Sequence, residues 1–431
     1  MKKTFLLFCL FVDIFVLSAQ TPTITGTHLK YNQIVGKDTI TVILFDSISA
    51  TTKIEYFGTT IKWYKFSDSV TPNSTFNYIY PDNATGYVID VDGKNDTLWV
   101  IDYSKLKPTF ISFEAENNPK NQCDDLNLNL NAIVPLISYK TFDGKLHNLP
   151  ARVFTVTYKT LEWTDKWKDI STSVKDIDLP TPTIKVPAPL CDTYFTLSGD
   201  QYATALGFPP YTFKSSILYK AVAVKCNPAS IVTIRSEKNE AERPSLATQI
   251  SGSAPLDIQF ISNANEPVAT YYKWTITKGA QQLITRTDKE IRYTFTEAGA
   301  YNVKLEASND NCSNSDSIKI TVSESAIYAP NVFTPNGDGL NDEFRVAYKS
   351  IISFQAWVYN RWGRLVCTWT DPQKGWDGNI SGRKAAAGPY FYVIKALGSD
   401  FDANSAPIGK TKLRLGEYLL KGDINIIRNK E

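Results

Sequence analysis

The chain has 431 residues, of which 43% are hydrophobic, and its 46 basic and 44 acidic residues leave a net charge of +2. Hydrophobic content at this level excludes a disordered chain, and the small net charge argues against a binding surface for nucleic acids or anionic membranes. Aromatic residues make up 13% of the chain and Met occurs once, a composition that favours strands over helices.

The first 19 residues have the pattern of a signal peptide. Two lysines precede an apolar run over residues 4–17, and Ser18 and Ala19 are small residues of the kind that a signal peptidase recognises. The run is shorter than the roughly 20 residues of a spanning helix and contains Asp13. No later stretch is long and apolar enough to span a bilayer, so we expect an exported protein without a transmembrane segment.

Polar and apolar residues alternate through nearly the whole remaining sequence, as in a strand with one buried face. Residues 301–307 form one such run, and each run is short and bounded by Gly, Pro, Asn or Asp. No long segment has convincing helical periodicity. The sequence therefore predicts an all-β protein of tandem immunoglobulin-like β-sandwich domains.

Shifts in composition divide the mature chain into four predicted domains, at residues 20–118, 122–236, 237–324 and 325–431. An Asn-rich linker follows the first domain, and the charged run 236–244 leads into the third. A proline-rich stretch over residues 180–189 crosses the second segment, which is therefore predicted to be either one domain or two.

The fourth segment carries the most specific motifs of the chain. They consist of Pro330, Asn331, Phe333, Pro335, Asn336, Gly337, Asp338, Gly339, Asn341, Asp342, Asn360, Arg361, Trp362, Gly363, Trp376, Asp377, Gly378, Gly388, Tyr390, Gly422 and Arg428. Their order and spacing resemble the gliding-motility-associated C-terminal domain, the type B sorting domain of the type IX secretion system. Pro389 and a longer insert between Leu397 and Leu420 depart from the usual pattern of that family.

The resemblance implies a compact sandwich that the outer-membrane translocon of the type IX system recognises. The cargo is then released or held at the cell surface. The residues themselves agree with a folded module, because Trp362 and Trp376 can anchor a small core and the motif glycines allow unusual backbone angles. Asn336, Asp338 and Asn341 are expected to satisfy loop amides, so these residues are expected to maintain the shape of the domain.

The acidic residues around Gly339 also raise the question of a calcium loop. An EF-hand loop with Gly339 at its sixth position would need acids at the first and twelfth positions, where this chain has Thr334 and Arg345. A hydrogen-bonded turn is the preferred interpretation, and neither a metal nor another cofactor is expected.

The third segment resembles a PKD repeat, an immunoglobulin-like sandwich found in surface proteins. Residues 293–305 carry the best match. Upstream, of the usual Trp-Asp-Phe-Gly-Asp-Gly run only Trp274 is present. The resemblance implies a sandwich, but it does not carry over any function of the missing loop.

Five cysteines remain after removal of the signal peptide, so at least one thiol stays free. Cys191 and Cys226 are a candidate disulfide within one domain, although spacing does not determine connectivity. The mature chain has two histidines, His28 and His147, and neither lies in a nucleophile–base motif. No catalytic residue and no enzyme are therefore predicted.

Exposed aromatic rings provide one route to ligand binding, since sugars stack on ring faces. Five aromatic residues are the candidates for such contacts: Trp63, Tyr64, Trp99, Trp163 and Trp167. Most of them are expected to fill cores, whereas Trp163 and Trp167 have charged neighbours and are expected to be the most exposed.

Taken together, the sequence predicts a non-enzymatic protein of the cell surface or extracellular space, exported by the type IX system. Its expected activity is adhesion or binding through the sandwich domains, with the translocon and an unidentified glycan or protein as partners. Two alternatives remain. One is a secreted hydrolase with its active site in residues 20–236, and the other is a structural spacer.

Overall fold

The computed structural model describes residues 21–36, 38–237, 239–408 and 413–428, and the predicted signal peptide lies outside them. Strands dominate these residues, and the only α-helix among them is α1 (Gln201–Ala205), so the prediction of an all-β protein is confirmed. Two compact units make up the chain, Met1–Thr160 with Asp169–Ala221 and Leu161–Lys168 with Val222–Glu431. Within the described residues, no helix has the length and apolar character needed to cross a membrane.

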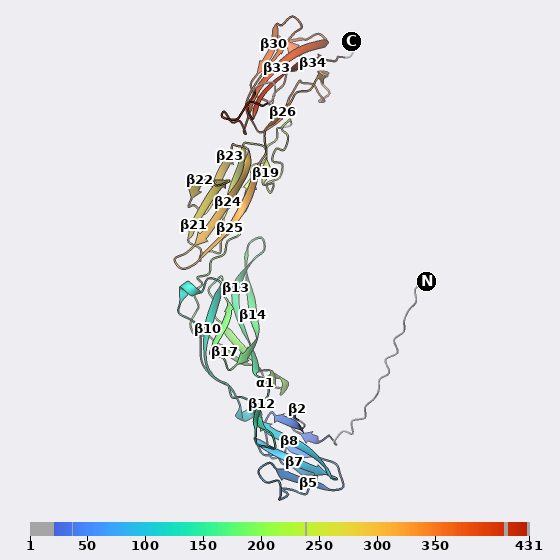
Figure 1. Ribbon diagram of the computed structural model, residues 1–431, viewed down its shortest axis with the longest axis vertical. Coiled ribbons are helices and arrows are strands. Elements are labelled where there is room, and N and C mark those ends of the chain that lie inside the picture. The colour runs from blue at the N-terminus through green and yellow to red at the C-terminus, as the bar shows by residue number, and fades with distance from the viewer. Residues whose placement is uncertain (1–20, 37, 238, 409–412, 429–431) are drawn as a thin grey trace, which may run out of the picture. The chain divides into compact units, whose positions relative to one another are not determined.

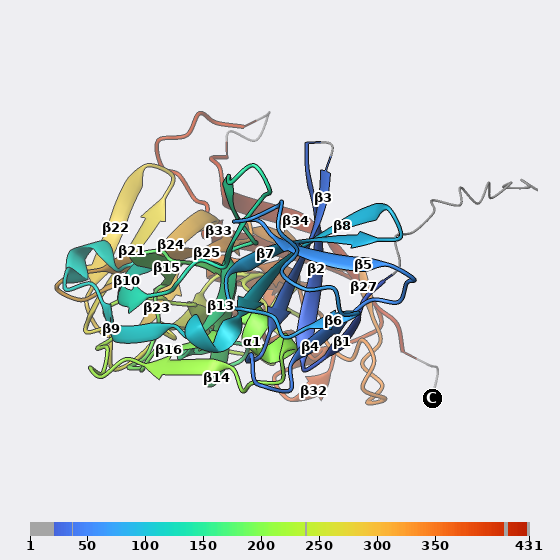
Figure 2. The same cartoon turned by 90° about the horizontal axis from the view of Figure 1, so that it is seen from below.

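The first sandwich of the first unit contains a five-stranded sheet and a three-stranded sheet (Figure 1 and Figure 2). The larger sheet has the order β2 (His28–Val35), β3 (Asp38–Phe45), β8 (Lys94–Asp102), β7 (Thr85–Val91) and β5 (Ile61–Lys65). The smaller sheet has the order β1 (Thr23–Thr25), β4 (Lys53–Glu55) and β6 (Tyr78–Ile79). Both faces of β3 are buried: Ile43 packs toward Ile54, while Val42 lies in a second cluster with Tyr139. Burial on both faces explains why β3 reads as an almost continuous apolar run.

The second sandwich of this unit also has two main sheets. One has the order β15 (Thr183–Pro187), β10 (Asp125–Ile133) and β9 (Thr109–Ala115). The other has the order β14 (Trp167–Leu179), β13 (Arg152–Trp163), β16 (Thr196–Gly199) and β17 (Tyr211–Lys214). The hairpin of β11 (Ser138–Lys140) and β12 (Leu146–Asn148) and the 3₁₀ turns Tyr103–Lys105 and Pro119–Asn121 complete the unit. Since β15 pairs with β10, the proline-rich stretch forms a strand of this sandwich.

The second unit contains the third and fourth sandwiches (Figure 1). The third pairs β18 (Ala229–Val232), β20 (Leu256–Ile261) and β23 (Glu290–Phe295) in one sheet. Its second sheet has the order β19 (Ser251–Gly252), β25 (Ser313–Val322), β24 (Gly299–Ser308), β21 (Tyr271–Lys278) and β22 (Gln281–Arg286). Trp274 is fully buried between them, with its ring centroid 5.8 Å from that of Phe260.

The fourth sandwich is built on a five-stranded sheet. Its order is β27 (Val332–Phe333), β34 (Glu417–Ile426), β33 (Gly388–Gly398), β29 (Ile351–Tyr359) and β30 (Leu365–Trp369). Two short pairs cover it, β26 (Ala326–Tyr328) with β28 (Ala347–Lys349) and β31 (Asn379–Ile380) with β32 (Arg383–Lys384). Every buried residue of its core cluster lies between Ile327 and Ile426. This sandwich therefore has a hydrophobic core of its own.

Two domain boundaries differ from the prediction. Strand β9 lies within the predicted first domain, 20–118, but its hydrogen-bonded partner is β10 of the second sandwich. Strand β18 lies within the predicted second domain, 122–236, but pairs with β20 of the third. Strand pairing between distant segments overrides the linker-like composition at both places.

The candidate disulfide between Cys191 and Cys226 is wrong, because both residues carry free thiols. The two cysteines belong to different compact units, contrary to the predicted domain that contained both. Cys226 is buried, and its Sγ lies 3.4 Å from Oδ1 of Asn314. Burial raises the pKa of the Cys226 thiol to about 11, which keeps it protonated.

The aromatic candidates for sugar binding differ in how far their side chains are buried. Trp63 is fully buried in the first sandwich and Trp99 is nearly so, which excludes both from a binding surface. Trp163 and Trp167 pack edge to face with ring centroids 5.2 Å apart. Both are half-buried, and Nε1 of Trp167 donates a hydrogen bond to the carbonyl of Asn263. Both side chains therefore make packing or hydrogen-bond contacts within the protein.

Candidate functional site

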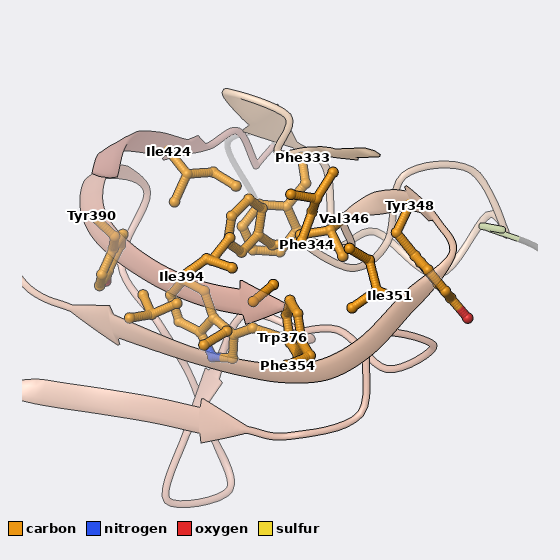
Figure 3. Packing of buried hydrophobic residues seen from close by; sticks show 14 of the residues in the cluster. Phe333, Phe344, Val346, Tyr348, Ile351, Phe354, Trp376, Tyr390, Ile394 and Ile424 are labelled. Atoms are coloured by element: carbon orange, nitrogen blue, oxygen red, sulfur yellow. The ribbon is translucent and has the colours of Figure 1, made fainter. Parts of the chain in front are cut away.

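Two motif residues of the fourth sandwich, Phe333 and Tyr390, pack against the ring of Trp376 in the core of the domain (Figure 3). This side chain is 1% exposed, and its ring centroid lies 4.9 Å from that of Tyr390 and 5.6 Å from that of Phe333. Nε1 of Trp376 donates to the carbonyl of Asn379, so the buried indole has its hydrogen-bond partner. The backbones of Trp376 and Phe344 exchange two hydrogen bonds, which attach the motif to the opening segment of the domain.

Arg428 joins two of the motif segments and the segment around Ala385. Its guanidinium donates to the carbonyls of Pro335 at 3.0 Å, Gly378 at 2.9 Å and Ala385 at 3.3 Å. A Cβ on Gly378 would lie 3.1 Å from Nη2 of Arg428 and 3.0 Å from Cγ of Pro335, and the φ of this glycine is +72°. Close approach and positive φ together explain the glycine. The sequence placed Arg428 in a closing motif, but its partners are visible only in the folded chain.

The loop between Pro335 and Asp342 is held by a carboxylate. The Asp342 side chain accepts hydrogen bonds from the backbone N–H groups of Asn336, Gly337 and Gly339 at 2.9, 2.6 and 2.7 Å. These three donors lower the pKa of Asp342 below its usual value. Asp338 likewise accepts from the N–H of Leu340. The loop is therefore held as a hydrogen-bonded turn, which is the interpretation that the sequence favours.

The hairpin between β29 and β30 contains the motif Asn360-Arg361-Trp362-Gly363. Oδ1 of Asn360 accepts from the backbone N–H groups of Trp362 and Arg364, and Gly363 takes a φ of +78°. Trp362 is 75% exposed, so the expectation that it anchors the core is wrong. The turn directs this side chain away from the sheet, and the Arg361 guanidinium lies 4.3 Å from the centroid of its ring.

The remaining motif residues support the fold locally. The carbonyl of Asn331 accepts from the N–H of Asn425 beside the parallel pair of β27 and β34, and Pro330 precedes it. The Asp377 carboxylate accepts from the backbone and side-chain amides of Asn379. Gly422 lies directly opposite Tyr392, whose ring occupies the space that a Cβ would need. Two further positions, Asn341 and Gly388, take positive φ angles.

A buried polar joint, which the sequence did not reveal, connects the third and fourth sandwiches. The Arg235 guanidinium pairs with Glu240 at 2.7 Å, and the Ser253 hydroxyl also donates to this carboxylate. Ser253 Oγ accepts from the backbone N–H of Ser350, and Ser350 Oγ donates to the carbonyl of Ser323 at 2.7 Å. Burial raises the pKa of Glu240. The joint is visible only in the folded chain, because Ser350 lies far from Ser253 in the sequence.

The two histidines have structural contacts. Nδ1 of His28 lies 2.8 Å from the carbonyl of Gly26, and its ring packs near Phe45. His147 stacks on Tyr139 with ring centroids 5.4 Å apart. These contacts give both imidazoles a place in the packing of the first unit.

Three family matches cover separate parts of the chain. Residues 115–215 match a fibronectin type III domain, residues 246–322 a PKD domain and residues 327–408 the CHU_C type IX secretion signal domain. All three are non-catalytic types of domain. The type IX secretion signal domain indicates handling by that secretion system and export to the cell surface or the extracellular space.

Solved structures similar to this chain include two multidomain proteins. The FN1–FN3 domains of chicken CNTN1 are 12% identical, with 74% of this chain and 99% of that chain covered at a TM-score of 0.23. Three N-terminal domains of the bacteriophage RB49 outer capsid protein Hoc are 13% identical, with 75% and 100% covered at a TM-score of 0.19. Among curated protein sequences, none matches this chain.

Proposed function

We propose that this protein is a non-enzymatic cargo of the type IX secretion system whose first three sandwiches present a binding surface outside the cell. Residues 1–19 serve as the signal peptide for the inner membrane, and residues 325–431 serve as the sorting domain for the outer membrane. The observation that carries this proposal is the type IX signal match at residues 327–408. In this region the motif residues Phe333 and Tyr390 pack on Trp376, and the carbonyls of Pro335 and Gly378 accept hydrogen bonds from Arg428.

A sorting domain has to be recognised as a folded object. The core of residues 327–426 supports this role, because every residue of the cluster comes from the domain itself. Between the signal peptide and this domain, the chain then needs no particular sequence for export. This division of labour agrees with preceding modules of the fibronectin and PKD types.

Within the sorting domain, the Arg361–Trp362 hairpin tip is the proposed contact with the translocon. A tryptophan that is 75% exposed contributes little to the folded core, and its ring is free to be covered by a partner. Asn360 and Gly363 hold the tip in one conformation, which reduces the entropy lost on binding. Arg and Trp are also the residue types that dominate binding energy at protein interfaces.

The experiment that tests the sorting role compares three chains in the native host. Deletion of residues 325–431 is expected to leave the protein in the periplasm, while the intact chain reaches the surface or the medium. A reporter with the signal peptide at its start and residues 325–431 at its end is expected to be exported. Unchanged delivery of the truncated chain would overturn the proposal.

A further inference from the structure

The three-stranded sheet of the first sandwich has one buried and one open face. Ile54 and Ile79, which pair across β4 and β6, are buried in the core between the sheets. Their neighbours along the strands point the opposite way, because side chains alternate between the two faces of a sheet. Lys53, Glu55 and Tyr78 are therefore on the open face, with Glu55 paired directly against Tyr78.

A row of aromatic rings runs along the β6 side of this face. The centroids of Phe76 and Tyr78 are 5.9 Å apart with the rings stacked, and those of Tyr78 and Tyr80 are 5.6 Å apart with the rings edge to face at 77°. Phe76 is 68% exposed and Tyr80 is 59% exposed. Phe57, two residues beyond Glu55 on the β4 side, is also exposed. A sandwich core does not require these rings.

The polar side chains next to the row form an ion pair and a hydrogen bond with one another. Nζ of Lys53 lies 3.0 Å from the Glu55 carboxylate and 5.1 Å from the centroid of the Tyr78 ring. Nδ2 of Asn77 donates to the same carboxylate at 2.8 Å. The positive and negative charges are therefore paired, and the surface offers donors and acceptors without a net charge. Such a surface complements a neutral ligand that is rich in hydroxyl groups.

We propose that this aromatic row, Phe76, Tyr78 and Tyr80, binds a neutral oligosaccharide chain. The proposal rests on the binding role given above and names its ligand class. Pyranose rings present C–H faces to aromatic rings and hydroxyl groups to their edges, and here the rings lie beside Lys53, Glu55 and Asn77. The exposed rings of Phe76 and Tyr80 on either side of Tyr78 offer separate contacts to successive units of such a chain.

A protein ligand fits this surface less well. Addition of a strand from a partner needs a long open edge, and β6 is an edge strand of two residues. A purely apolar docking face would also lack the charged pair beside Tyr78. The ion pair offers no excess charge for an acidic or basic peptide.

The test uses the mature full-length chain and isothermal titration with three neutral linear probes, cellohexaose, chitohexaose and mannohexaose. We expect at least one probe to bind. Phe76→Ala, Tyr78→Ala and Tyr80→Ala are each expected to weaken its binding about tenfold, and Tyr80→Phe is expected to retain most of it. Tyr271→Ala is the matched control, because Tyr271 is 57% exposed on the third sandwich. Circular dichroism checks that each variant stays folded.

The outcomes separate this proposal from the broader one. Binding that all three alanine variants retain would place the sugar site elsewhere and overturn the aromatic row, while the binding role would stand. Failure of all three probes would overturn the neutral-oligosaccharide assignment in the same way. Loss of sorting on deletion of residues 325–431 is measured independently, so failure of the export role is distinguishable from either result.

Discussion

The two motif tryptophans of the fourth sandwich have opposite environments. Trp376 is enclosed by Phe333, Phe344 and Tyr390, and its indole N–H is bonded inside the domain. Trp362 lies at a hairpin tip with most of its ring in solvent. Trp376 is part of the hydrophobic core that stabilises the fold, whereas Trp362 is exposed on its surface. Stability and export should therefore respond differently when each is changed.

The largest effect on stability is expected from Trp376→Ala. Removal of a fully buried tryptophan costs about 3–5 kcal/mol, since the surrounding rings cannot close the cavity. Hydrogen exchange of the β33 and β34 amides in the mature chain measures the change, because both strands pack on this ring. Trp376→Phe, which keeps most of the apolar contact, is the control and should lose less. Equal protection in the alanine variant and the original chain would contradict the described core.

The next effect is expected from Arg428→Ala, with a loss of about 1.5–3 kcal/mol, the range for hydrogen bonds to a charged group. Three carbonyls from separate segments lose their donor in this variant. Arg428→Lys keeps the charge but not the planar fork, so it should recover only part of the loss. The same exchange experiment, read at β27 and β34, decides between these results. Full recovery by lysine would mean that charge alone matters.

A smaller, pH-dependent effect is expected at Asp342. Its folded pKa lies below the ordinary value of about 3.9. The contribution of its hydrogen bonds is therefore complete above that value and is lost as the pH falls through the folded pKa. Amide chemical shifts of Gly337 and Gly339 should report this titration. Asp342→Asn should be less stable than the original chain at neutral pH and should match it in acid. A difference that persists at low pH would show that the carboxylate charge is not responsible.

The sequence predicted the strand content and the motif positions because both depend on local patterns. Alternation identifies a strand such as β24 without its partners, and the glycines and acids around Gly339 indicate a turn by composition alone. Trp376 was also placed correctly in the core of its domain, since large apolar residues within strand-rich segments are usually buried.

The errors arose where long-range geometry decides. Arg428 finds its carbonyl partners 43 to 93 residues earlier in the chain, a distance that no local pattern encodes. Trp362 was assigned to the core by residue type, although its exposure depends on the direction of a hairpin turn. The boundary near residue 236 failed because β18 is short and its partner β20 follows a long connection. The sequence also does not predict the joint of Glu240, Ser253 and Ser350, because its hydrogen bonds connect residues that are far apart in the chain.

The smallest effect on stability, and the sharpest test of the comparison, is expected from Trp362→Ala. An exposed side chain away from caps and cores changes stability by less than about 0.5 kcal/mol, so hydrogen exchange in β29 and β30 should be unchanged. Export should nevertheless fall if this ring is covered by the translocon, and the periplasmic fraction of the protein measures that loss. Leu340→Ala is a suitable control, because Leu340 is similarly exposed in another loop of the same domain. If the Trp362 variant is exported as well as the control, the hairpin tip is not the recognition surface. If the Trp362 variant unfolds, Trp362 is required for stability as Trp376 is. Only a folded, retained variant separates the residue that builds the sorting domain from the residue by which it is recognised.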